Sequence, residues 1–247
     1  DLKFLKCFLK GYFVLKSEFF KGVRHGLPIG LGYLSVSFGF GIMAVQAGLS
    51  AAAAVGISAT NLTSAGQAAG VGIIAAGGSY LEMALTQLVI NLRYSLMGIS
   101  LSQKLAPNFT VPQRMLAAFG ITDEIFAVAS AQKKRLSADY LYGMILIAFA
   151  GWALGTLLGA VMGQILPSSV TGALGILLYG MFLAILLPAA RRSRPILFVI
   201  LLASLLSLLF YYTIPALSSG FSVIISSLLA SAAAALLFPS PDEEVQS

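Results

Sequence analysis

The chain has 247 residues, of which 58% are hydrophobic and 10% charged, with a mean hydropathy of +0.93 and a formal net charge of +6. This charged fraction is less than half of the usual value, so the composition excludes an ordinary soluble domain and predicts an integral membrane protein. The apolar runs are continuous and rich in Ala, Leu and Gly. That pattern favours membrane-spanning helices over a barrel of alternating strands.

The basic residues form three clusters. Six of them precede residue 25, and the others include the stretches "QKKR" (132–135) and "RRSR" (191–194). Clusters of this kind remain on the cytoplasmic side of membrane spans, so we expect no nucleic-acid binding. The single cysteine, Cys7, excludes an internal disulfide and argues against a thiolate metal site. We expect no metal and no cofactor.

The chain divides into three parts. Residues 1–24 place lysines opposite apolar side chains at helical spacing, which predicts a basic amphipathic helix on the anionic cytoplasmic membrane surface. Residues 25–238 are expected to form a single transmembrane domain, and residues 239–247 an acidic tail.

The sequence predicts an all-α polytopic protein with about eight membrane segments, at roughly 20 apolar residues each. They are expected near 27–47, 50–69, 79–103, 113–132, 140–164, 170–190, 195–214 and 219–238. With a cytoplasmic amino terminus, "QKKR" and "RRSR" then both lie on the cytoplasmic side of the membrane. The link 73–80 should also lie inside but has no basic residue, so segment 50–69 is alternatively a broken or re-entrant element.

Spans one and five share a glycine-rich pattern over 32–48 and 143–163, which indicates two structural repeats of four spans in the same orientation. The fifth span places four glycines on one face, and these are Gly151, Gly155, Gly159 and Gly163. Such a stripe allows close approach of another helix, either from this chain or from a partner subunit.

Two stretches look like interruptions of membrane helices. One contains Gly39 and Gly41 within the first span. The other, over 58–70, is unusually polar, and its candidate binding residues are Asn61, Thr63, Ser64, Gly66 and Gln67. Broken helices present N–H and C=O groups that bind carboxylates and amines near the membrane midplane. The alternative is that these hydroxyl and amide groups bond between helices.

Four ionisable residues are expected at membrane depth, namely Glu82, Arg93, Asp123 and Glu124. A charge at the centre of a helix costs roughly 2.5–3.5 kcal/mol, so these residues should face the protein interior or water. Glu82 and Arg93 are about 16 Å apart along one helix and cannot pair, and Glu82 can equally lie at the membrane boundary. Arg93, near Asn91, either holds an internal group or binds a substrate carboxylate.

Asp123 and Glu124 follow Gly120 and Thr122, a combination that loosens a helix. Successive helical residues point about 100° apart, so the two carboxylates cannot share one environment. Burial favours the neutral form of a carboxyl group, which makes either residue a candidate proton carrier. An ion pair with Arg93 is the structural alternative, and the two interpretations are compatible.

Four blocks carry a resemblance to a known family: "LPIGLGYLSVSFGFGIMAVQAGLS" (27–50), "TSAGQAAG" (63–70), "INLRYSLMGISL" (90–101) and "ITDEIFAVAS" (121–130). In this order they resemble the AzlC family, the large subunit of bacterial branched-chain amino-acid exporters. Members of that family often have His after the Arg of the "NLR" block, where this chain has Tyr94. The resemblance implies export of Leu, Ile, Val and Met across the bacterial cytoplasmic membrane, together with a small AzlD-type membrane subunit.

The leading hypothesis is therefore a secondary exporter in which Arg93 holds the substrate carboxylate or organises Asp123, and Asp123 or Glu124 carries a proton. The sequence has no phosphate-binding loop, so we expect an ion gradient, a substrate gradient or a partner to supply the energy. A passive channel for a small solute is the alternative. An intramembrane enzyme is disfavoured, because the single histidine, His25, lies at the membrane edge without a metal-ligand set.

Overall fold

The computed structural model describes residues 2–163, 165–167, 169, 180, 183–184, 186–214 and 216–238, with side chains from residue 17 onward. The expected tail, 239–247, and most of the expected span 170–190 lie outside these residues. Contacts divide the chain into two compact units. Unit 1 comprises residues 1–67 and 91–178, and unit 2 comprises residues 68–90 and 179–247.

The described chain is helical, as the composition predicts. Its helices are α1 (Leu2–Gln46), α2 (Ala51–Thr60), α3 (Ser64–Ala75), α4 (Tyr80–Ser102), α5 (Val111–Phe119), α6 (Asp123–Ser130), α7 (Ala138–Met162), α9 (Arg194–Thr213) and α10 (Ser219–Leu237). Among the described residues, four apolar stretches are long enough to cross a membrane, and they are Ser17–Gln46, α7, α9 and α10. At 1.5 Å per residue, α4 is also of spanning length. The protein is a multi-pass membrane protein, although the described residues do not form eight complete spans.

Helix α1 is continuous from Leu2 to Gln46. It has no break at residue 24, so the basic segment 1–24 extends directly into the first span, and its position on the membrane surface stays a prediction. The expected interruption at Gly39 and Gly41 is wrong, because both residues lie inside the helix. Gly41 instead permits close packing, since a Cβ atom there would overlap the carbonyl oxygen of Thr156 in α7.

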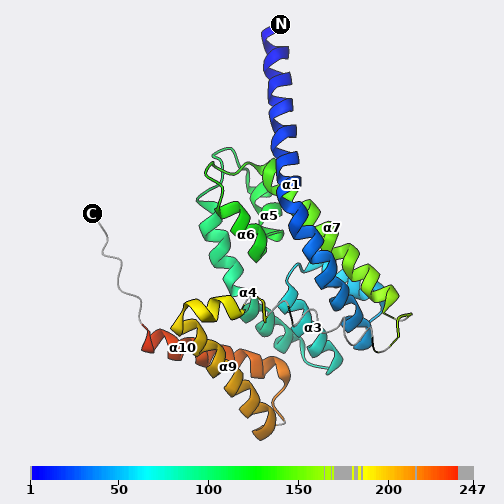
Figure 1. Ribbon diagram of the computed structural model, residues 1–247, viewed down its shortest axis with the longest axis vertical. Coiled ribbons are helices and arrows are strands. Elements are labelled where there is room, and N and C mark those ends of the chain that lie inside the picture. Colours follow the sequence, from blue (N-terminus) through cyan, green and yellow to red (C-terminus); the bar gives the residue numbers. More distant parts are fainter. Residues whose placement is uncertain are drawn as a thin grey trace. The chain divides into compact units, whose positions relative to one another are not determined.

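Helices α1 and α7 lie side by side in unit 1 (Figure 1). Their backbones approach so closely that a Cβ atom at Gly151 would overlap the Gly30 carbonyl oxygen, and one at Gly159 would overlap that of Phe38. The glycine stripe of α7 is therefore covered by α1 of the same chain. The paired positions advance together along both helices, so the helices run in the same direction. If the chain consists of two repeats in the same orientation, their first helices, α1 and α7, must be parallel. The existence of the two repeats stays a prediction.

Helices α5 and α6 form a hairpin rather than the expected single span over 113–132. Helix α5 runs along α7, with the Tyr142 hydroxyl 3.3 Å from the Gln113 carbonyl oxygen and the Phe119 ring 6.4 Å from the Phe149 ring. Helix α6 then runs back toward the end of α4. Lys104, just after α4, donates to the Ser130 carbonyl oxygen in the last turn of α6. With nine residues, α5 rises only about 13 Å, roughly half the thickness of a bilayer core.

The two open ends of this hairpin lie where α7 begins. The backbone N–H of Ala106 donates to Leu136 at 2.9 Å, and Leu136 donates to Lys104 at 2.9 Å. Lys21 of α1 lines a small cavity there with Lys134 and Arg135. We call this level of unit 1 the basic end. The first and second basic clusters of the sequence thus meet at one end, as the positive-inside pattern predicts.

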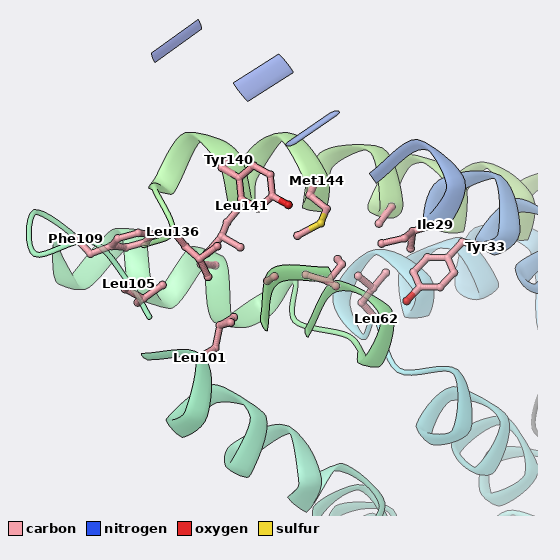
Figure 2. Packing of buried hydrophobic residues seen from close by; sticks show 14 of the residues in the cluster. Ile29, Tyr33, Leu62, Leu101, Leu105, Phe109, Leu136, Tyr140, Leu141 and Met144 are labelled. Carbon is pink, nitrogen blue, oxygen red and sulfur yellow. The ribbon is translucent and has the colours of Figure 1, made fainter. Parts of the chain in front are cut away.

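A buried apolar cluster runs through unit 1 (Figure 2). Phe109, Leu105 and Leu136 lie at one end of it, and Tyr33 and Leu62 lie at the other. The cluster therefore extends from the basic end to the helix breaks that carry the polar residues described below.

In unit 2, α9 and α10 pack against each other. Glu82 is 4% exposed, and its carboxylate accepts the Gly220 backbone N–H at 3.0 Å and the Ser218 hydroxyl. Gly220 lies in the first turn of α10, where N–H groups have no partner within the helix. A negative charge there is favourable, so Glu82 acts as a cap for α10.

Candidate functional site

The hairpin turn places two carboxylates at the start of α6. Helix α5 ends at Gly120, and Thr122 caps α6 by accepting the Ile125 N–H at 3.4 Å. Asp123 and Glu124 occupy the first turn, where the helix dipole favours negative charge. The predicted loosening at 120–122 is confirmed as a complete break.

Asp123 forms an ion pair with Arg93 of α4, with 2.9 Å between Nη2 and Oδ2. The Arg93 side chain is 46% exposed and that of Asp123 is 35% exposed, so neither is enclosed by unit 1. The Arg93 guanidinium also lies 5.2 Å from the Tyr94 ring centroid, within cation–π range. The ion pair that the sequence offered as the structural alternative is present, and both of its side chains are partly exposed.

Glu124 lies in a different environment. The Tyr33 hydroxyl of α1 is hydrogen bonded to the Glu124 carboxylate and lies 2.6 Å from the Thr122 hydroxyl. A phenol has one proton, so when it donates to Glu124 the Thr122 hydroxyl can act as the second donor. Trp152 of α7 packs edge-on against the Tyr33 ring at 5.1 Å and fixes it. The separation of the two carboxylates that helical geometry predicts is therefore confirmed.

These residues lie at the middle of their helices. Tyr33 lies near the centre of the stretch Ser17–Gln46, Trp152 near the centre of α7, and Arg93 near the centre of α4. Because each helix is long enough to cross the membrane, the cluster belongs near the midplane. Charged groups at that depth are expensive, which makes the cluster a functional candidate.

The second polar break lies between α2 and α3. Thr63 donates to the Asn61 side chain at 2.8 Å, and Ser64 begins α3. The segment predicted as broken or re-entrant over 50–69 is indeed broken. Leu62, inside this break, shares the buried cluster with Ile125 and Tyr33, so both breaks contact one apolar core.

Gln67 continues this polar set into the interior. Its amide nitrogen donates to Ser58 at 2.9 Å, and the Ser58 hydroxyl lies 2.7 Å from that of Thr156. The amide oxygen of Gln67, which is 1% exposed, has no hydrogen-bond partner among the described residues. Some of these hydroxyl and amide side chains thus form hydrogen bonds between helices, as the alternative interpretation proposed. The amide oxygen of Gln67 remains available as an acceptor.

The other predicted site residues lie on three helices. Gly39 and Gly41 are buried within α1, Gly66 is buried in the first turn of α3, and Asn91 is half-buried in α4. Gly41 has a packing role against α7. A role of these residues in binding stays a prediction.

Sequence reasoning missed Tyr33 and Trp152. Tyr33 lies in a glycine-rich stretch, and its partner Glu124 is 91 residues away. A signal was nevertheless present. Tyr and Trp are typical of the membrane interfaces, so either residue at mid-span indicates a buried hydrogen-bond or packing partner.

The arrangement offers two kinds of chemistry. Arg93 and Asp123 present opposite charges side by side, which matches the carboxylate and ammonium groups of a zwitterion. Glu124 is hydrogen bonded to a phenol rather than paired with a cation. Neighbouring residues of one helix turn, Asp123 and Glu124, therefore differ in their partners.

Comparisons with known proteins agree with the membrane assignment. A family model described as AzlC protein matches residues 28–166. The chain is 32% identical over 185 residues to the inner membrane protein YgaZ of Escherichia coli (strain K12), covering 72% of this chain and 76% of that protein. It is 34% identical over 178 residues to an uncharacterized membrane protein of Archaeoglobus fulgidus, covering 70% and 77%.

A third relative is more distant. The chain is 26% identical over 155 residues to an uncharacterized membrane protein of Helicobacter pylori (strain 26695), covering 60% of this chain and 67% of that protein. No solved structure matches.

Proposed function

This chain belongs to the AzlC family of membrane proteins, and from that premise we propose that it is a secondary transporter that exports branched-chain amino acids. The substrates proposed are Leu, Ile, Val and Met, with a proton as the coupling ion. No catalytic activity and no cofactor form part of the proposal.

The observation that carries the proposal is the half-exposed ion pair between Arg93 and Asp123 at mid-membrane depth. A fully enclosed ion pair would suit a purely structural role. An open pair can exchange its partner, because an amino acid supplies a carboxylate for Arg93 and an ammonium for Asp123. Net charge in the site is then unchanged by binding, which avoids leaving an unpaired charge at low dielectric.

Glu124 supplies the coupling step in this proposal. The carboxyl group takes a proton from the outer side, and the protein returns it to the cytoplasm after the amino acid has left. Tyr33 supports this role, since its hydroxyl can donate to the ionised carboxylate and accept from the protonated one. Proton entry down its gradient then drives amino-acid exit.

Orientation, membrane and partners complete the proposal. The basic end faces the cytoplasm because it gathers Lys21, Lys134 and Arg135, and the amino terminus is cytoplasmic. The membrane is the bacterial cytoplasmic membrane, and anionic lipids contact the amino-terminal segment of α1. A small AzlD-type membrane subunit, which the family resemblance suggests, completes the transporter.

Counterflow of labelled leucine in proteoliposomes tests the proposal, with and without the small subunit. A carrier exchanges labelled for unlabelled substrate and saturates with concentration. A passive channel, the second class considered, shows neither saturation nor counterflow. Absence of leucine flux under all of these conditions would contradict the proposed function.

A further inference from the structure

A second cavity of unit 1 lies beside the charged site. It has a volume of about 190 Å³ and lies between the end of α4 and α5, with α7 behind it. Its lining is almost entirely apolar and includes Gly98, Leu101, Ala117, Ala118, Ile121 and Leu141. We propose that this cavity receives the aliphatic side chain of the exported amino acid while its charged groups bind Arg93 and Asp123.

Position supports this assignment. Ile121 lines the cavity and belongs to the same break as the ion pair, two residues before Asp123. The step from Ile121 to Asp123 spans at most about 7 Å of extended chain, so the cavity reaches the helix break that carries the carboxylate of the ion pair.

The size and polarity of the cavity also fit. An apolar cavity of about 150 Å³ can accept a benzene ring, so this volume accommodates the four carbons of a leucine side chain. Ser102 and the charged residue Arg114 also line the cavity. Ser102 ends α4 and Arg114 lies in the first turn of α5, both toward the basic end, so the part near Ile121 is apolar.

Gly98 indicates that the space is kept open. A Cβ atom at Gly98 would meet no atom within 4 Å, and its backbone does not require positive φ. Glycine weakens the interior of a helix, and here neither close packing nor backbone geometry explains it. Gly151 is the contrasting case, because α1 fills the space beside it.

This assignment rests on the proposed function, and one experiment separates the two. Leucine and valine counterflow are measured in proteoliposomes for the wild type, Gly98→Ala and Gly98→Leu, with the small subunit present. Gly72→Leu is the matched control, because Gly72 also faces open space but lies in α3 outside the cavity. Filling the cavity should lower the leucine-to-valine ratio, modestly in Gly98→Ala and by about 10-fold or more in Gly98→Leu.

Each outcome decides the matter. A reduced ratio in the Gly98 variants with an unchanged ratio in Gly72→Leu supports the cavity as the side-chain site. If Gly98→Leu does not accumulate in the membrane, the ratio for Gly98→Ala decides. An unchanged ratio, or equal loss of both substrates, overturns the assignment and leaves the cavity to a lipid chain, while wild-type counterflow still upholds the transporter. Absence of counterflow in the wild type overturns both.

Discussion

The Arg93 guanidinium lies 2.9 Å from the Asp123 carboxylate, joining the middle of α4 to the first turn of α6. The neighbouring residue, Glu124, turns instead toward Tyr33 of α1. One helix turn thus holds a carboxylate paired with a guanidinium and a carboxylate bonded to a phenol hydroxyl. The proposed roles of substrate binding and proton transfer follow from this division.

Glu124→Gln should separate exchange from coupling. Glutamine keeps the shape of the side chain and accepts a hydrogen bond from Tyr33, but it cannot take up a proton. In wild-type proteoliposomes an acidic outer solution should accelerate leucine export, because it loads Glu124 from outside. The variant should retain leucine counterflow and lose this acceleration. Export that still responds to the imposed pH gradient would show that the proton uses another group.

Tyr33→Phe should slow proton-driven export and also lower stability. The change removes only the hydroxyl and keeps the ring against Trp152. A hydrogen bond to a charged group contributes about 1.5–3 kcal/mol to stability, so we expect a lower thermal midpoint, and export per folded protein should fall because Glu124 loses its hydroxyl partner. Tyr140→Phe is the matched control, because the Tyr140 hydroxyl bonds His25 at the basic end, 2.8 Å away. Equal effects in the two variants would argue against a special role of Tyr33.

Gly151→Ala should destabilise unit 1, because the added methyl group would overlap the Gly30 carbonyl oxygen. Overpacking of this kind costs about 1–3 kcal/mol, which should appear as a lower thermal midpoint in detergent. Gly32→Ala on α1 meets no atom within 4 Å and should be neutral or slightly stabilising. A stable Gly151→Ala protein would mean that α1 and α7 are not packed as described.

Glu82→Ala should weaken unit 2 rather than the transport step. The carboxylate accepts from Gly220 N–H and the Ser218 hydroxyl, and such charge-assisted bonds contribute about 1.5–3 kcal/mol each. We expect lower abundance and thermal stability, with unchanged leucine affinity in the protein that remains. Glu82→Gln keeps an acceptor oxygen and should be milder. A selective loss of leucine affinity in either variant would instead place Glu82 in the transport pathway.

The sequence predicted the features that depend on local geometry. Adjacent carboxylates must diverge on a helix, and Gly120 with Thr122 is a plausible end and start of helices, so the break and the separation of Asp123 from Glu124 could be inferred. The same reasoning failed at Gly39 and Gly41. A glycine weakens a helix by only about 1 kcal/mol, and the close approach of α7 compensates for it at Gly41.

The hairpin and the Tyr33 contact depend on partners far along the chain. A hydropathy pattern over 113–132 cannot distinguish one crossing from two short helices that return to the same side, because both bury similar side chains. The return of α6 is visible through contacts between distant residues, such as that of Lys104 with Ser130, 26 residues away. Likewise, nothing near Tyr33 in the sequence indicates that Glu124 will lie against its hydroxyl.

The most direct test of the account is saturable counterflow of labelled leucine by Asp123→Asn in proteoliposomes with the small subunit, at matched protein amounts. Asp139→Asn, in the first turn of α7, is the control acid outside the break. The account predicts that counterflow is lost in Asp123→Asn and kept in the wild type and Asp139→Asn. Unchanged counterflow in Asp123→Asn would contradict the claim that the amino acid replaces the ion pair and would leave Asp123 with a structural role.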